Sequence, residues 1–294
     1  GLGRMGQGMA RRLLERGHEV AGYDLAAENV ARLQAEGGAG AESLEELVAA
    51  LEPPRVVWIM VPHGEPTART VEALLGLVER DDVVIDGGNS HYPESIRHAH
   101  ACERRGVHFL DIGVSGGVWG YEAGFNLMVG GPEPAFRHVE PLLEALAPPD
   151  GYARVGGHGA GHFVKMVHNA IEYAMLQGIG EGFELLHASD FALDLARIAR
   201  LWNRGSVVRS WLLELLGEAL ESEGNDLEAI GDRVDDSGTG RWTVDFALEN
   251  AVPVPAIATS LFQRFDSRLE RRFAHQVIAA LRKQFGGHAV EEAR

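Results

Sequence analysis

The chain begins with Gly1-Leu2-Gly3-Arg4-Met5-Gly6, the G-x-G-x-x-G spacing of a turn that brings a cofactor pyrophosphate to a helix N-terminus. The pattern that follows predicts a helix over residues 4–16 and then a strand that ends at Asp24. A carboxylate about 20 residues beyond the glycines is placed to accept hydrogen bonds from ribose hydroxyls. These features predict a dinucleotide site. NAD is the expected cofactor, with NADP possible, because Asp24 stands where a 2′-phosphate would lie.

Short β-rich runs alternate with helical patterns up to about residue 157, which predicts a parallel sheet covered by helices. The predicted strands are residues 19–24, 56–61, 83–86, 107–112, 125–129 and 152–155. Beyond the glycine-rich segment 156–161 the strand patterns end, and helical patterns continue from residue 163 to about 284. The expected fold is therefore α/β, with a Rossmann-type doubly wound sheet followed by an all-α C-terminal domain.

We expect the domain boundary between residues 157 and 158. Residues 1–157 form the predicted dinucleotide-binding domain, and residues 158–294 form a helical domain for substrate binding and dimerisation. The strand that precedes the glycine turn in Rossmann-type folds is missing from the printed sequence. We expect a truncated gene model to explain its absence.

Composition restricts the class of protein. The net charge of −16, from 27 Lys and Arg against 43 Asp and Glu, argues against a nucleic-acid surface and an anionic membrane. The longest apolar stretch, residues 56–62, is too short to span a bilayer, and no signal peptide is visible. The single cysteine, Cys102, cannot form an intrachain disulfide. We expect a cytoplasmic protein with no nucleic-acid or membrane partner and no metal site.

The run Lys165-Met166-Val167-His168-Asn169-Ala170-Ile171-Glu172-Tyr173 contains one of only two lysines in a chain with 25 arginines. At a helical 100° per residue, its polar side chains share an arc of roughly 140°, and residues 164, 167, 171 and 174 fall outside that arc. One face is therefore predicted to carry chemistry and the other to face the core. A lysine amine can lose its proton and act as a base, which a guanidinium cannot do. A solvated polar face with a chance lysine is the alternative.

Together these motifs resemble the 6-phosphogluconate dehydrogenase family, the decarboxylating enzymes of the pentose phosphate pathway, in a short form. The resemblance covers nearly the whole chain, and residues 161–173 are its most specific part. It implies oxidative decarboxylation of 6-phospho-D-gluconate to D-ribulose 5-phosphate and CO2, with reduction of NAD or NADP. The motifs that carry it are Gly1 to Gly6, Val61-Pro62, Asp86-Gly87-Gly88-Asn89-Ser90, Ser115-Gly116-Gly117 and the lysine run.

The resemblance also implies residue roles. Lys165 would be the base that takes the C3 hydroxyl proton, and Glu172 the acid that later protonates C1. The residues implied to bind the cofactor are Gly1, Gly3, Arg4, Met5, Gly6, Asp24, Val61, Pro62 and Asn89. The residues implied to bind the substrate are Asn89, Ser115, Gly116, Gly117, His168, Asn169, Tyr173, Thr239, Arg264, Arg282 and His288.

Within the substrate set, Tyr173, Thr239 and Arg264 would bind the phosphate. Arg264 has apolar sequence neighbours, so a bound anion or a buried carboxylate must satisfy it, and we favour the anion. Arg282 and His288 would come from a neighbouring subunit, which implies a homodimer or homotetramer that shares its tail residues.

Three features depart from the family's pattern. Ser237 stands where long members have a lysine, so one phosphate charge is missing or is supplied by Arg241. His63 stands where the family has alanine, close to the expected cofactor. The helical part is about half as long as in the long members.

Two other functions remain open. A β-hydroxyacid dehydrogenase such as 3-hydroxyisobutyrate dehydrogenase has a similar glycine motif, but it typically contains Lys-x-x-Asn-Asn. His168-Asn169 followed by Glu172-Tyr173 favours a larger, phosphorylated substrate. A catalytically silent nicotinamide-binding protein is suggested by the missing strand and by Ser237, whereas Lys165 and Glu172 argue against it.

Overall fold

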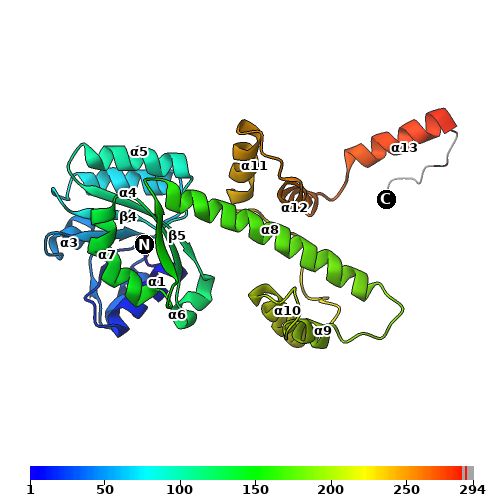
Figure 1. Ribbon diagram of the computed structural model, residues 1–294, viewed down its shortest axis with the longest axis horizontal. Helices are drawn as coiled ribbons and strands as arrows, with labels where there is room; N and C mark the ends of the chain where they lie inside the picture. The colour runs from blue at the N-terminus through cyan, green and yellow to red at the C-terminus, as the bar shows by residue number, and fades with distance from the viewer. Residues whose placement is uncertain (287–288, 290–294) are drawn as a thin grey trace. The chain divides into compact units, whose positions relative to one another are not determined.

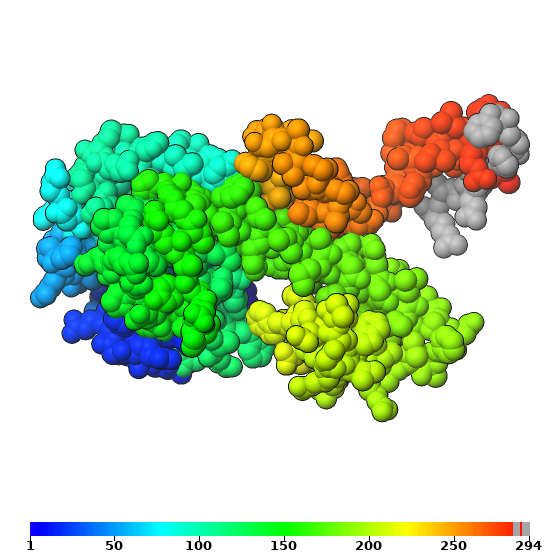
Figure 2. Space-filling model, in the orientation of Figure 1, coloured from blue at the N-terminus to red at the C-terminus, as the bar shows by residue number. Residues whose placement is uncertain are grey.

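The computed structural model describes residues 1–286 and 289, and the chain divides into two compact units, Gly1–Ala170 and Ile171–Arg294 (Figure 1). The first unit is a helix-covered sheet, and Figure 2 shows it, from blue to green, as a closely packed body. The described part of the second unit is helical. The predicted fold class is confirmed.

The strands of the first unit form two sheets. A five-stranded sheet has the order β3-β4-β5-β6-β7, and a separate parallel pair joins β1 to β2. The bounds are β1 Ala21–Gly22, β2 Ala39–Gly40, β3 Val56–Ile59, β4 Val83–Asp86, β5 His108–Ser115, β6 Asn126–Gly130 and β7 Tyr152–Gly156. The strand predicted over residues 19–24 is thus reduced to two residues, which pair with β2 alone.

The sequence patterns predicted a parallel sheet, but the larger sheet is mixed. Strand β6 runs antiparallel to β5, and the other neighbouring pairs are parallel. Residues 116–125 join β5 to β6 through η1 (Gly117–Trp119) and α6 (Gly120–Ala123). A parallel pair needs a crossover of about a dozen residues or more, usually with a full helix. This short connection therefore reverses the chain direction.

The two sheets are separate at the position where a Rossmann-type fold has its first strand. In the strand order 3-2-1-4-5-6 of Rossmann-type folds, the first strand lies between the strands that correspond to β1 and β3. Among residues 1–286, none forms a strand at that position. The Gly1 nitrogen donates to the Tyr23 carbonyl at 3.0 Å, so the glycine turn lies beside the end of β1.

Alternate strand residues serve two hydrophobic cores, as the pleat requires. On one face, Leu110 and Ile112 pack with α1 (Arg4–Glu15) and α7 (Glu133–Leu146). The opposite face packs against three further helices, α3 (Leu44–Ala49), α4 (Glu65–Leu75) and α5 (Tyr92–Glu103). Helix α2 (Ala27–Ala35) contributes Leu33 to a small cluster beneath α1. Burial raises the pKa of the Cys102 thiol on α5 to about 12, which agrees with a structural cysteine.

The helical region begins with α8 (Ala160–His187), which is longer than any other described helix. Its first turns pack on the sheet, and the contact-based division of the chain therefore falls within α8, later than the predicted 157/158 boundary. The C-terminal half of α8 packs with α9 and α10 around Phe183. The remaining helices are α9 Leu195–Trp202, α10 Trp211–Glu223, α11 Thr239–Glu249, α12 Pro255–Asp266 and α13 Phe273–Gly286.

Candidate active site

The glycine turn leaves its backbone open where a pyrophosphate would approach. A Cβ on Gly6 would lie 2.1 Å from the Gly1 oxygen, and one on Gly1 would lie 2.3 Å from the Met60 oxygen. A Cβ on Gly3, in contrast, would meet nothing within 4 Å. The first turn of α1 also contains no acidic residue, so its N–H groups and helix dipole favour an anion. These residues fit a dinucleotide.

Asp24 lies beside this turn as an ionised carboxylate. Its oxygens accept from the Leu2 nitrogen at 2.6 Å, the Ala26 nitrogen at 2.9 Å and the Asn29 amide at 3.2 Å. Burial opposes ionisation, but these three hydrogen bonds outweigh it and lower the pKa of Asp24. A carboxylate has about four acceptor positions, so about one remains for a ribose hydroxyl in this arrangement.

The turn after β4 ties Asn89 to the end of β5. Asp86 accepts from the Ser90 hydroxyl at 2.7 Å and from the Gly88 nitrogen at 2.9 Å, which closes the turn. Asn89 has a left-handed φ of 54°. Its side-chain oxygen accepts from the Val114 nitrogen at 3.1 Å, and its amide donates to the Val114 oxygen at 3.4 Å. The predicted residues Asn89 and Ser115 are therefore brought close together.

The turn Ser115-Gly116-Gly117 depends on its two glycines. Gly116 has φ 117° and Gly117 has φ 54°, a region of backbone conformation that other residues rarely adopt. The chain therefore leaves β5 sharply after Ser115. Val61 and Pro62 follow β3, where the Pro62 carbonyl accepts from the Thr67 hydroxyl at 2.9 Å, and His63 is exposed beside them.

Lys165 is held where α8 approaches β5 closely. A Cβ on Gly113 would lie 2.4 Å from the Lys165 Cβ, so only glycine allows the two elements to meet here. The lysine is 6% exposed, and its Nζ lies 3.4 Å from His168 Nδ1. His168 Nδ1 also lies 3.1 Å from Asn169 Oδ1. The structure thus brings together Lys165, His168 and Asn169, as the sequence predicted.

The assignment of the two faces of α8 was wrong. Val164 is 37% exposed and Ile171 is 50% exposed, although both belong to the predicted core face. Lys165 and Tyr173, on the predicted chemical face, are each only 6% exposed. The physical reason is that the glycine contacts with the sheet lie on the side of α8 that carries the lysine.

Glu172 and Tyr173 lie two turns further along α8, about 10 Å from Lys165 along the helix axis. The Tyr173 oxygen accepts from the Ser237 nitrogen at 3.0 Å and lies 3.1 Å from the Ser237 hydroxyl. That hydroxyl lies 3.0 Å from the Thr239 hydroxyl, at the start of α11. The second unit therefore contains a cluster of three hydroxyl groups, Tyr173, Ser237 and Thr239.

Arg264 adds a positive charge to this hydroxyl cluster. Its guanidinium stacks over the Tyr173 ring, with Cζ 3.5 Å from the ring centroid, and donates to the Asp235 carbonyl at 2.8 Å. A carbonyl and an aromatic ring thus contact this arginine, whereas the sequence argument had required an anion or a carboxylate. Three hydroxyls and one guanidinium are suited to binding a phosphate.

Arg241 has a different partner. It donates two hydrogen bonds to Asp236, at 2.7 and 3.0 Å, and lies over the Phe265 ring. The hydrogen bond from Arg241 is the main cause that lowers the pKa of Asp236 to about 2. Ser237 supplies no charge, but its hydroxyl joins the hydroxyl cluster. Its hydrogen bonds to Tyr173 have no local sequence signal, because the two residues are far apart in the chain.

Other features lie outside these clusters. Arg282 is an exposed residue of α13, and His288 lies outside the described residues.

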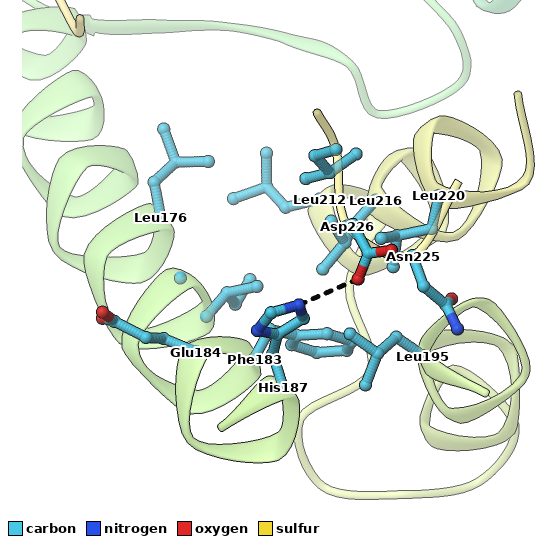
Figure 3. Close-up of a pocket in the computed structure, with 13 residues that line it drawn as sticks. Leu176, Phe183, Glu184, His187, Leu195, Leu212, Leu216, Leu220, Asn225 and Asp226 are labelled. Atoms are coloured by element: carbon cyan, nitrogen blue, oxygen red, sulfur yellow. Dashed lines mark hydrogen bonds and ion pairs between the residues drawn. The ribbon is translucent and has the colours of Figure 1, made fainter. Parts of the chain in front are cut away.

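A cavity of about 370 Å³ lies between the C-terminal half of α8 and α10 (Figure 3). Leucine, isoleucine and phenylalanine side chains line most of it, together with the ion pair of His187 and Asp226, so it is poorly suited to a phosphorylated sugar acid. Over the part of the chain that is described, no three His, Cys, Asp or Glu residues gather as a metal site would require, and no helix has the length and apolar character to cross a membrane.

Family models match both parts of the chain. The NAD binding domain of 6-phosphogluconate dehydrogenase matches residues 1–157, and the 6-phosphogluconate dehydrogenase C-terminal domain matches residues 161–293. The chain belongs to the 6-phosphogluconate dehydrogenase family. The resemblance inferred from the sequence motifs is confirmed.

Relatives within this family differ in length. The chain is 48% identical to the NAD(+)-dependent, decarboxylating 6-phosphogluconate dehydrogenase of Haloferax volcanii, over 99% of this chain and 96% of that protein. It is 37% identical to the decarboxylating 6-phosphogluconate dehydrogenase of Lactococcus lactis, over 99% of this chain but only 66% of that protein. The chain thus spans about two thirds of the long relatives and nearly all of the Haloferax protein.

Solved structures share this fold. Plasmodium falciparum 6-phosphogluconate dehydrogenase superposes with a TM-score of 0.83 at 27% identity, over 100% of this chain and 66% of that one. Mycobacterium tuberculosis 3-hydroxyisobutyrate dehydrogenase superposes with a TM-score of 0.73 at 25% identity, over 96% of this chain and 97% of that one. Both enzyme classes considered from the sequence therefore have this architecture, so the residues of the site must distinguish them.

Proposed function

We propose that this chain catalyses the oxidative decarboxylation of 6-phospho-D-gluconate to D-ribulose 5-phosphate and CO2, with NAD+ as oxidant. The observation that carries the proposal is the distribution of groups along α8. A buried lysine next to His168 and Asn169 is followed, two turns later, by Glu172 and by the tyrosine of the hydroxyl cluster. The family membership supports the same activity.

Lys165 begins the reaction in its neutral form, because only a neutral amine can take the C3 hydroxyl proton. The glycine turn and Asp24 would hold NAD+, which would accept the hydride that C3 loses. The 3-keto acid so formed can accept the electrons released when CO2 leaves, and the protonated Lys165 donates a hydrogen bond to the C3 oxygen at that step. Glu172 then protonates C1 of the product.

The other residues bind and orient the substrate. His168 and Asn169, together with Asn89 and the Ser115-Gly116-Gly117 turn, offer hydrogen bonds to the hydroxyl and carboxylate groups of a sugar acid. Tyr173, Thr239 and Arg264 bind the phosphate, and the Ser237 hydroxyl joins them in place of the lysine of long relatives. A metal is not required in this sequence of steps.

Oxidation of a small β-hydroxy acid is the second candidate, and the structural likeness to a 3-hydroxyisobutyrate dehydrogenase of nearly equal length favours it. Such a substrate carries no phosphate, so the hydroxyl cluster and Arg264 would have no ligand. We therefore rank it below 6-phosphogluconate.

A substrate comparison separates these functions. The purified protein is assayed with 6-phosphogluconate and with 3-hydroxyisobutyrate, each with NAD+ and NADP+. We expect the highest kcat/KM for 6-phosphogluconate with NAD+. A higher kcat/KM for 3-hydroxyisobutyrate would establish the second candidate, and binding of NAD+ without turnover of either acid would indicate a silent nicotinamide-binding protein.

We further propose a homodimer or homotetramer in which Arg282 and His288 complete the active site of a neighbouring subunit. Helix α13 carries Arg282, and the sequence between Arg282 and His288 contains Gly286 and Gly287, a residue type that commonly ends a helix. Mixing Lys165→Arg subunits with Arg282→Ala subunits should restore part of the activity, because one hybrid site then has both intact residues. Subunit exchange without regained activity would refute the shared tail.

The protein is also proposed to act in the cytoplasm. The single cysteine is buried and has a raised pKa, which suits a reducing compartment where disulfides are rare. Fluorescence microscopy of a tagged protein in the source cell would test this location.

A further inference from the structure

The N-terminus of α8 has no capping group of its own. Its first turn contains no acidic residue, and the preceding Gly159 has no side chain. The first N–H groups of any helix lack partners within that helix, and a Ser, Thr, Asp or Asn usually supplies one. Because Lys165 lies in the second turn, the group that holds this helix end also affects the proposed base.

A carboxylate from β5 takes this role. Asp111 Oδ1 accepts from the Gly159 nitrogen at 2.7 Å, and Oδ2 accepts from the His162 nitrogen at 2.9 Å. Asp111 is fully buried, at 0% exposure, and it lies at the positive end of the α8 dipole. Burial raises its pKa, and the two backbone N–H groups that it accepts from oppose that rise. Both carboxylate oxygens are thus committed to the start of one helix.

The same face of β5 carries two further functions. Side chains alternate along a strand, so Asp111, Gly113 and Ser115 all lie on one face. Gly113 is the residue against which the Lys165 Cβ packs, and Ser115 begins the turn proposed to hold the sugar acid. On this one face of β5, Asp111 binds the start of α8, Gly113 contacts Lys165, and Ser115 begins the proposed substrate turn.

A second element secures the first turn of α8. His162, at 1% exposure, has its Nδ1 2.7 Å from the Ser95 hydroxyl of α5. This bond holds the side of the helix, whereas Asp111 fixes its position along the axis. The Lys165 amine follows His162 by less than one turn, so an axial shift of the helix would displace it directly.

We propose that Asp111 is a positioning residue for the reaction, which sets the location of Lys165 by anchoring the N-terminus of α8 to β5. The inference rests on the proposed function, in which Lys165 is the base. Asp111 itself is not assigned a contact with substrate or cofactor. Its loss should therefore lower kcat and leave the KM for NAD+ nearly unchanged.

Asp111→Asn tests this inference, because the amide keeps the shape but offers one acceptor oxygen instead of two. A misplacement of about 1 Å can cost up to about 100-fold in rate, and we expect kcat to fall at least about 10-fold. The KM for NAD+ should stay within about two-fold of the wild-type value. If the variant does not fold, Asp111→Ser, which keeps one acceptor in less volume, replaces it.

Asp82 provides a matched control. It is also 0% exposed, and its carboxylate accepts from the backbone nitrogens of Arg55 at 2.7 Å and Glu79 at 2.8 Å. It precedes β4, at the opposite end of that strand from the Asn89 turn. Asp82→Asn should lower stability but leave the kcat of the folded enzyme within about two-fold of wild type.

Amide hydrogen exchange gives a readout that does not depend on turnover. Residues 159–169 should exchange at least about 10-fold faster in Asp111→Asn than in wild type, and at the wild-type rate in Asp82→Asn. An equal loss of kcat in both variants, or a wild-type kcat in Asp111→Asn, would overturn the inference. A wild-type enzyme without turnover of 6-phosphogluconate would refute the proposed function instead, and the exchange rates would still decide whether Asp111 anchors α8.

Discussion

Gly113 on β5 and Lys165 on α8 approach so closely that a Cβ on the glycine would lie 2.4 Å from the Cβ of the lysine. Gly113→Ala should therefore push the lysine out of place and lower kcat about 10-fold to 100-fold, because the proposed base must reach the C3 hydroxyl. Gly178→Ala is the control. Gly178 lies on α8, as Lys165 does, but a Cβ there would meet nothing within 4 Å. Unchanged turnover in Gly113→Ala would show that this contact does not position the base.

Lys165→Arg should retain the positive charge and much of the substrate affinity but remove the base. We expect kcat to fall about 100-fold or more, the usual range for a general base, with a smaller change in the KM for 6-phosphogluconate. Lys283→Arg, at the only other lysine and on an exposed site of α13, should have wild-type kinetics. Near-normal turnover in Lys165→Arg would exclude this residue as the base.

The carboxylate of Asp24 should make NAD+ the preferred cofactor. Its lowered pKa keeps it charged at neutral pH, where it repels a 2′-phosphate. The ratio of kcat/KM for NAD+ to that for NADP+ should exceed one and should fall in Asp24→Asn. Glu28→Gln removes an exposed charge nearby and should leave the ratio unchanged. Equal or higher efficiency of the wild type with NADP+ would contradict this account.

The ion pair of Asp236 with Arg241 should contribute pH-dependent stability. The pKa of Asp236 is lowered to about 2 from an ordinary value of 3.8, so its contribution is complete above about pH 4 and is lost as the pH falls toward 2. Asp236→Asn should lower the free energy of unfolding by roughly 1–2 kcal/mol at pH 7, with a much smaller difference near pH 2. Chemical denaturation at both pH values measures this difference, and an equal difference at both would show that the charge is not its cause.

The sequence predicted which residues of the candidate site lie close together along the chain. The residues that carry chemistry on α8 lie within nine consecutive positions, so a single helical pattern places them together. The glycine turn and Asp24 were likewise recognisable, because their spacing reflects the path of the chain from a turn through one helix to the next strand.

Features that depend on distant residues could not be predicted. Helical periodicity separates two faces of α8, but it does not say which face packs, and the exposed Val164 and Ile171 show that the face with the lysine was the packed one. The direction of β6 was missed because a strand pattern carries no information about direction. The caps from Asp111 and the hydrogen bonds of Ser237 join residues far apart in the chain, with no local signal.

Simultaneous measurement of NADH and CO2 with 6-phosphogluconate as substrate tests the central claim most directly. The wild-type protein should form the two products in equal amounts, because each oxidised sugar acid loses one carboxylate. Lys165→Arg should form both at a rate at least about 100-fold lower, still in equal amounts. NADH formation without CO2, or no reaction of the wild-type protein with 6-phosphogluconate, would contradict the account.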